Sequence, residues 1–457
     1  MYPQPHHDLG GTRVVGQAGG MLLTRTAQVT GLAAGLSRAL ASWRKPLAIH
    51  DPGKIVTDLA ITLAVGGDCL ADAGVLRGEP AVYGPVASDP TISRLISLLA
   101  ADAPTVLTAI NTARAQARAR VWKLAGAHSP AHRASVAEPL TIDVDATLVT
   151  AHSDKENAKP TFKKGYGFHP LCVFADHGPE GGGEPLAIML RPGNAGSNTA
   201  VDHIAVLRDA FKQLPHRPHT RPGKTVLVRV DGAGYSHQLL NWLTAQRVQY
   251  SAGWTLPADA GPLIEQIGAN GWTPAYDAER KPREGAWVAD ITGLLNLTGW
   301  PAGMRIIIRK ERPHPGAQLT ITDVDGHRIT AFATNTRRGQ LADLELRHRR
   351  RARCEDRIRH AKTTGLTNLP LHGFAQNQIW CALVAMACEL KAWMQLLALP
   401  GHPARRWEPK RLRYRLYTIP AALTRSSRQT RIRYPTHHPW AALLAIALTA
   451  LTLLDGT

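Results

Sequence analysis

The chain has 457 residues, a length that predicts about two to four domains rather than a single core. A hydrophobic content of 44% excludes wholesale disorder. The net charge of +19 favours a polyanionic partner such as nucleic acid, because basic surface gains affinity by counterion release; a merely basic soluble surface is the alternative.

The first part of the chain is predicted to be helical. Residues 1–20 contain glycines and prolines, so we expect a loose N-terminus. They lack the apolar core of a signal peptide, so we do not expect one there. Helical patterns then cover residues 22–43, 55–76, 89–100 and 105–124. We therefore predict an all-α N-terminal domain over residues 21–138, serving DNA binding or assembly. Ordinary bundle packing and a helix-turn-helix both fit it.

Residues 139–252 have the pattern of a sheet flanked by helices. The predicted elements are strands 140–149, 168–175 and 185–190, helix 198–214, strand 225–230, helix 235–246 and strand 248–252. This order of three strands, helix, strand, helix and strand resembles that of an RNase H-like core. The near-continuous apolar run of residues 225–230 is typical of a strand buried on both faces.

The remaining chain is predicted to interrupt this core and then complete it. Residues 253–338 contain short strand patterns, at 304–310, 319–325 and 328–334, and predict a β-rich insertion. Residues 339–400 predict the second part of the core, with helices over 340–362 and 376–399.

Residues 401–457 predict a basic C-terminal region. In Lys410-Arg411-Leu412-Arg413-Tyr414-Arg415 we expect a strand with its arginines on one face, where phosphate contact and a solvated strand edge are both open. The apolar run 440–454 is shorter than the roughly 20 residues of a membrane span, so we expect a buried terminal helix and no membrane contact. The predicted fold class is α/β, a mixed-sheet core with a β-rich insertion and an all-α N-terminal domain.

Two strands carry carboxylates that suggest a metal site. Asp143 and Asp145 share one face of an otherwise apolar strand, where burial is costly unless a cation pairs with them. Mg²⁺ prefers such oxygen ligands. Asp231 ends the second apolar strand, just before Gly232. The strand pattern leaves open which of Asp143 and Asp145 is the metal ligand.

A third acid comes from the predicted helix 340–362. At 100° per residue Glu355 falls on the apolar stripe with His348 and Arg351, while Asp356 and Arg357 point away from it. Three acids from two strands and one helix suit two-metal phosphoryl transfer, with Arg351 and Lys362 holding phosphates. A structural ion-pair cluster is the alternative explanation.

At these residues the sequence resembles the transposase DDE-domain family of bacterial insertion sequences, in the cut-and-paste group with a YREK motif. Arg351, Glu355 and Lys362 match the motif spacing Tyr-x2-Arg-x3-Glu-x6-Lys, and His348 stands in place of the tyrosine. Asp145-Ala146-Thr147 matches the family's Asp-x-Thr motif, which favours Asp145 over Asp143 as the first acid. Residues 164–170 and 190–194 also resemble the family's core.

The resemblance implies how the protein works. It implies Mg²⁺ (or Mn²⁺) held by Asp145, Asp231 and Glu355, and DNA contacts from His348, Arg351 and Lys362. It implies double-stranded DNA with terminal inverted repeats, a target DNA, a homodimer in the DNA complex and a bacterial cytoplasmic, nucleoid-associated location. In relatives an aromatic residue of the β insertion holds a flipped base, for which the candidates are Trp272, Trp287 and Trp300.

Two other functions remain open from the sequence. One is an RNase H-like nuclease or resolvase without strand transfer. The other is a DNA-binding protein derived from a transposase that no longer cuts. The five cysteines form no Cys-x-x-Cys pair, so neither disulfides nor a cysteine zinc site is expected.

Overall fold

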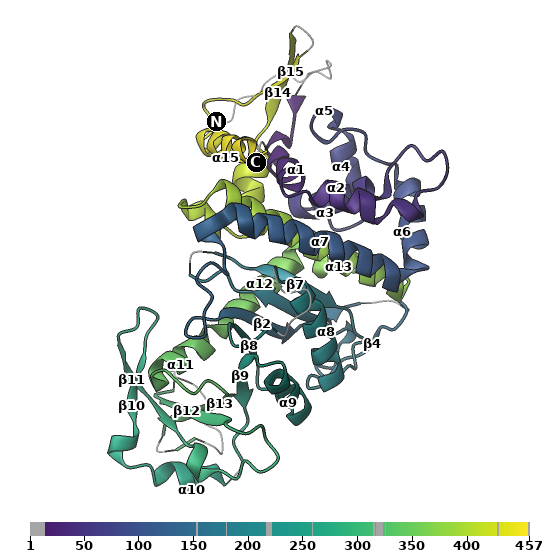
Figure 1. Cartoon of the computed structure of the whole chain (residues 1–457). Helices are drawn as coiled ribbons and strands as arrows, with labels where there is room; N and C mark the ends of the chain where they lie inside the picture. Colours follow the sequence, from purple (N-terminus) through teal and green to yellow (C-terminus); the bar gives the residue numbers. More distant parts are fainter. Residues whose placement is uncertain are drawn as a thin grey trace.

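The computed structural model describes residues 14–151, 154–179, 181–215, 222–257, 259–313, 316, 323–324, 326–426 and 429–455. Helices from the N-terminal part and the C-terminal part lie together at one end of the molecule, a large sheet crosses the middle, and a β-rich lobe forms the other end (Figure 1). The predicted strand 319–325 falls largely outside the described residues.

The central sheet has nine strands in the order β10-β11-β12-β13-β9-β8-β2-β6-β7. In chain order they are β2 Leu140–Ala146, β6 Leu171–Ala175, β7 Glu184–Met189, β8 Val226–Val230, β9 Gln249–Trp254, β10 Thr273–Tyr276, β11 Pro282–Asp290, β12 Arg305–Glu311 and β13 Arg328–Thr334. β2 pairs in parallel with β8, and β8 with β9, while β6 and β7 are antiparallel additions on the other side of β2. The strands predicted at 225–230 and 328–334 are thus present, and the strand predicted at 140–149 is present but ends at Ala146.

The insertion continues this sheet. Four antiparallel strands, β10 to β13, extend it because β13 pairs with β9, with Ala333 opposite Ala252. Our expectation of β structure in residues 253–338 is confirmed, but these strands do not form a sheet of their own. The lobe is hydrogen-bonded to the core through the β13–β9 pair, so it continues the core sheet.

Helices cover the sheet and form the N-terminal end. They are α1 Met21–Val29, α2 Leu32–Ala39, α3 Pro52–Val65, α4 Ala73–Arg77, α5 Pro80–Tyr83, α6 Asp89–Ala100, α7 Ala103–Ala125, α8 Ala200–Lys212, α9 His237–Ala245, α10 Ala260–Glu265, α11 Leu341–Arg349, α12 Arg353–Ala361, α13 Phe374–Ala398, α14 Pro409–Leu412 and α15 Ala441–Leu454. Local signals set several starts. Asp51 accepts a hydrogen bond from the backbone N–H of Lys54 and precedes Pro52, which begins α3.

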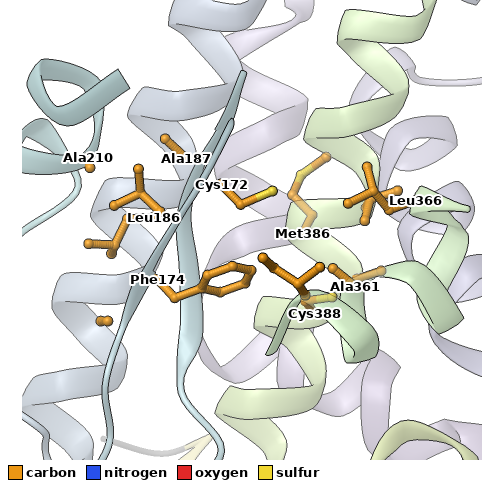
Figure 2. Close-up of a cluster of buried hydrophobic side chains, with 14 of the residues drawn as sticks. Cys172, Phe174, Leu186, Ala187, Ala210, Ala361, Leu366, Met386 and Cys388 are labelled. Carbon is orange, nitrogen blue, oxygen red and sulfur yellow. The ribbon is translucent and has the colours of Figure 1, made fainter. Parts of the chain in front are cut away.

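Helix α13 is the centre of the fold. Every residue from Ile379 to Ala398 is buried, and α3, α7 and β7 all pack against it. Cys172 and Phe174 of β6 point toward Met386 and Cys388 of α13, and Leu186 of β7 points toward the other face of the sheet (Figure 2). By length and composition α13 could span a membrane, but 94% of its most apolar stretch lies inside the fold. The N-terminal helices and the sheet therefore share one core.

The two ends of the chain meet. β1 (Val14–Val15) pairs with β14 (Ala421–Ser426), which forms a hairpin with β15 (Gln429–Arg433). Val15 is fully buried, so residues 14–20 are ordered and our expectation of a loose N-terminus is wrong for them. Residues 1–13 lie outside the described residues.

A buried ionic cluster fastens α7 to the core. Arg114 Nη2 lies 2.6 Å from Glu389 Oε1 of α13, and Arg118 contacts both Glu389 and Glu184, all with side chains at most 3% exposed. Such a cluster stabilises a fold only while it is complete, because removing one partner leaves an uncompensated buried charge.

We therefore expect Glu389→Ala to lower the free energy of unfolding by about 3–5 kcal/mol in urea denaturation, since buried Arg114 loses its carboxylate partner and buried Arg118 loses one of its two. Asp209→Ala is the matched control, because it breaks the exposed Lys212–Asp209 pair and is expected to cost under about 1 kcal/mol. Equal losses in the two variants would contradict a role for the cluster in holding α7.

Candidate active site

Two carboxylates meet at one edge of the sheet. Asp145 is near the end of β2, and Asp231 directly follows β8. Since Val144 pairs with Val230 in parallel register, Asp145 and Asp231 occupy the next position on neighbouring strands. Parallel strands end at the same edge, so both side chains are presented together there.

Asp145 is an unusual carboxylate. Its side chain is 14% exposed, and Arg351 Nη1 lies 3.1 Å from its Oδ2. Burial raises the pKa of Asp145 to about 6, Arg351 opposes that shift, and the charge of Asp231 adds to it. One arginine thus only partly offsets burial beside a second acid, and this set of oxygen donors fits a divalent cation.

The third predicted acid, Glu355, lies at the rim. Its side chain is 70% exposed, and its Oε1 is 4.0 Å from Arg351 Nη2. Arg351 therefore lies between Asp145 and Glu355, and the structure brings these three residues together. Asp356, which is also exposed, pairs with Arg359.

The predicted inward position of Glu355 is wrong. A 3₁₀ turn at residues 350–352 separates α11 from α12, and its three residues per turn break the 100° phase counted from His348. Arg357, predicted on the outer face, is instead 3% exposed. The match of Glu355 to the motif spacing does not depend on this phase.

Asp143 has a different partner from the metal considered above. It is fully buried; its Oδ1 lies 2.6 Å from Arg229 Nε, and its Oδ2 lies 2.6 Å from Arg357 Nη1. Both oxygens are engaged by arginines, which favours Asp145 over Asp143 as a metal ligand. The cation expected beside it is a pair of guanidinium groups.

Asp143 belongs to a closed network that sequence reasoning missed. Asp176, at the end of β6, binds Arg229 at 2.8 Å and Arg357 at 2.6 Å, and Arg229 also donates to the carbonyl of Arg347. The network ties α11 and α12 to β2, β6 and β8, directly behind Asp145. The sequence contains one indication of this network, because Arg229 is a lone charge inside an apolar strand. In the structure Arg229 lies opposite Asp143 in register.

A cavity of about 210 Å³ opens between α11–α12 and the insertion strands. It is lined by Arg309, Thr330, Ala331, Phe332, Glu345, His348, Arg349, Arg351, Ala352 and Glu355. His348 bonds Ser251 Oγ through Nδ1 at 2.9 Å and stacks on Phe332 at 4.5 Å. Burial, with the nearby arginines, lowers the pKa of His348 to about 3, so the His348 ring is neutral at pH 7.

The sequence matches the model of the family "Transposase DDE domain group 1" over residues 4–455, almost the whole chain. The chain belongs to this transposase family. It is therefore a DNA transposase, an enzyme of DNA recombination that cleaves DNA and transfers the ends, and it depends on a divalent metal ion as DDE transposases do.

Other comparisons add little to that assignment. No curated protein matches this chain. Among solved structures, the piggyBac transposase synaptic complex with hairpin DNA aligns with a TM-score of 0.42 and 10% sequence identity, covering 87% of this chain and 79% of that one. A likeness at this TM-score carries no argument about the site.

In the transposase, Lys362 lies beside the strand of Asp145. Its Nζ donates to the carbonyl of Leu148 at 2.9 Å, three residues beyond Asp145. Burial lowers the pKa of Lys362, and the nearby Lys163 adds to this effect. The structure thus places Lys362 at the site, where its ammonium group holds the loop that follows β2.

The basic C-terminal segment of the transposase is helical, and the predicted strand is wrong. Residues 409–412 form α14 and residues 413–417 continue it as a π turn. Arg413 donates to the carbonyls of Leu63, Ala64 and Thr363, which makes it a structural residue. Arg415 lies over the rings of Trp407 and Trp440. Of the three arginines only Arg411 is exposed.

Two histidines next to Asp231 were also missed. His169 Nδ1 bonds the carbonyl of Ala195, and His203 Nδ1 bonds that of Thr199, each at 3.0 Å. A Cβ on Gly234 would lie 3.1 Å from both Asp231 Oδ1 and His203 Nε2, so Gly234, Asp231 and His203 are closely packed. His169 could have been found from the sequence, because it lies in the stretch 164–170 that resembles the family's core.

The three candidate tryptophans of the insertion contact different side chains. Trp300 stacks on His237 at 3.4 Å and packs against Tyr235, which follows Asp231 by four residues. Trp272 lies under Lys310, and Trp287 meets His327 edge-on. Of the three tryptophans, Trp300 is thus the one that packs against the segment after Asp231.

Proposed function

We propose that this transposase is the cut-and-paste enzyme of a bacterial insertion sequence, of the group with the YREK motif, and that Asp145, Asp231 and Glu355 hold its metal ions. The observation that supports this proposal best is the pair Asp145 and Asp231 at the ends of adjacent parallel strands, with Arg351 as the bridge to Glu355. Mg²⁺, with Mn²⁺ as a substitute, would activate a water molecule or a 3′-OH of the DNA as the nucleophile and stabilise the leaving oxygen.

We further propose that residues 139–252 and 339–400 are an RNase H-like core. The strand order β7-β6-β2-β8-β9, with the first three strands antiparallel and the last three parallel, supports this. On this interpretation α12 returns to the sheet after the insertion and brings Glu355 to the acids of β2 and β8.

The residues around the acids would bind the DNA backbone. Arg351 is 20% exposed and already spans two carboxylates, so its planar guanidinium is suited to a phosphate that enters the site. Arg411 is exposed and suited to a more distant phosphate. Lys362 would keep the loop after β2 in place and add positive charge beside the strand.

The partners follow from the same proposal. They are double-stranded DNA with terminal inverted repeats and a target DNA, bound by a homodimer in the bacterial cytoplasm next to the nucleoid. The net charge of +19 supports a polyanionic partner.

Incubation with a supercoiled plasmid that carries the element with its flanking DNA tests the proposal. With Mg²⁺ we expect excised element and joined products, and with EDTA neither. Cutting without joined products would favour a nuclease without strand transfer. DNA binding without cutting in either Mg²⁺ or Mn²⁺ would contradict the proposed activity and favour a protein that only binds DNA.

A further inference from the structure

A small sheet projects from the edge of the central sheet where Asp145 lies. β3 (Val149–Thr150), β5 (Tyr166–Phe168) and β4 (Lys159–Pro160) are joined in the order β3-β5-β4. Since Thr147 N–H donates to the Pro170 carbonyl, this sheet continues the β2–β6 pair beyond Asp145. Residues 159–166, which we call the lysine turn, form its tip.

The lysine turn has a rigid base. Thr161 N–H donates to the Gly165 carbonyl at 2.8 Å, and Lys164 N–H donates back to the Thr161 carbonyl at 3.0 Å. A Cβ on Gly193 would lie 2.3 Å from the Lys159 carbonyl oxygen and 2.6 Å from that of Gly167, so the loop at Gly193 is packed against the turn. The backbone of the turn is thus held in one conformation.

The side chains of the turn face outward and are chemically unusual. Phe162 is 68% exposed, and Lys163 Nζ lies 5.8 Å from the centre of its ring. Lys159, Lys163 and Lys164 are also exposed, and the chain has no acid from residue 157 to residue 175. An exposed phenylalanine among lysines buries little apolar surface within the fold, which points to a partner with negative charge and flat apolar faces.

The turn also lies close to the active site. The ring of Phe162 is 5.7 Å from that of His169, one of the two histidines beside Asp231. Lys163 is near enough to Lys362 to lower the pKa of that lysine. A DNA strand at Asp145 and Asp231 therefore passes within reach of the lysine turn.

We propose that the lysine turn binds the DNA strand next to the cut, with its lysines on phosphates and the Phe162 ring stacked on an unpaired base. This inference rests on the proposed function and deepens it. The base must be unpaired because the face of a paired base is covered by its neighbours in the duplex. Stacking on an aromatic ring combined with basic side chains is the usual chemistry of single-strand binding.

Equilibrium binding of the full chain to two DNAs tests the proposal. One is a blunt duplex of an element end, and the other is the same duplex with a short single-stranded thymidine tail. We expect Phe162→Ala to weaken binding to the tailed DNA about 5- to 100-fold and to leave the blunt duplex almost unchanged. We expect Phe162→Trp to retain the affinity.

Two controls complete the design. Leu453→Ala removes an apolar side chain of similar exposure, 73%, on α15, and is expected to change neither affinity. Replacing Lys163 and Lys164 by glutamine is expected to weaken binding to both DNAs and reduce the salt dependence by about one to two units of slope, whereas Lys212→Gln on α8 leaves the slope unchanged.

Each outcome decides something. Unchanged binding of the tailed DNA by Phe162→Ala, or an equal loss on both DNAs, would overturn the stacking. A double lysine variant with the wild-type salt slope would overturn the phosphate contacts. Wild-type protein that binds neither DNA would instead overturn the proposed function, which separates the two failures.

Discussion

Asp145→Asn is expected to abolish metal-dependent DNA cleavage and at the same time to make the protein more stable. The loss of activity follows from the loss of a charged metal ligand, worth several kcal/mol in the transition state, or at least about 10³-fold in rate. The gain in stability follows from burial, which raises the pKa of Asp145 to about 6 even though Arg351 opposes the shift.

The pH dependence of this gain in stability follows from the raised pKa of Asp145. The pKa of Asp145 rises from 3.8 to about 6 in the folded protein, so the folded state binds the proton more tightly than the unfolded chain. The cost of the charged form is absent below 3.8, grows as the pH rises to about 6, and is complete above it. We therefore expect Asp145→Asn to gain about 1–3 kcal/mol in urea denaturation near pH 8, and less near pH 5.

Metal binding provides a second measurement that does not depend on catalysis. Mg²⁺ is expected to raise the melting temperature of the wild type, because it binds the folded state alone, and to have little effect on Asp145→Asn. Asp231→Ala should also lose cleavage and the Mg²⁺ response. If the Asp145→Asn variant cleaved DNA at the wild-type rate, or if it were clearly less stable than the wild type, Asp145 would be a structural residue rather than a metal ligand.

Asp143→Ala is expected to have the opposite effect on stability: it should lose about 3–5 kcal/mol in urea denaturation. The variant leaves the guanidinium groups of Arg229 and Arg357 short of a partner in a buried site. Asp176 remains and holds part of the network, which keeps the loss below that of two unpaired charges.

Cleavage by Asp143→Ala is also expected to fall, because Arg357 fixes α12, and with it Glu355, on β2. Asp356→Ala on the same helix is the matched control: it breaks an exposed pair with Arg359 and should cost under about 1 kcal/mol. Asp143→Ala with the stability of this control would contradict the network. Unchanged stability combined with lost Mg²⁺ binding would make Asp143 a metal ligand after all.

Much of the site could be found from the chain alone because it rests on short-range patterns. Alternating polar and apolar residues identify the strand that carries Asp145, and an apolar run identifies the strand before Asp231. The spacing of Arg351, Glu355 and Lys362 is a property of the sequence itself. Two strands of the insertion, β12 and β13, were also recognised because each has a local β pattern, whereas β10 and β11 were not predicted.

What the sequence left undecided depends on residues that are far apart in the chain. Asp143 and Asp145 look alike along β2, and only the register with β8 sets Asp143 opposite Arg229 and leaves Asp145 at the open edge. The orientation of Glu355 required the 3₁₀ turn at residues 350–352, which side-chain periodicity does not reveal.

The same reason explains the other corrections. Arg413 looks like a DNA-binding arginine until α3 and the turn after α12 surround it with carbonyl groups. The insertion looks like a separate unit until β13 pairs with β9. The sequence by itself thus determined which residue types and elements are present, because these follow from local periodicity. Only the tertiary structure decided which charges are buried and paired and which remain free for metal and DNA, because pairing depends on register and packing between distant segments.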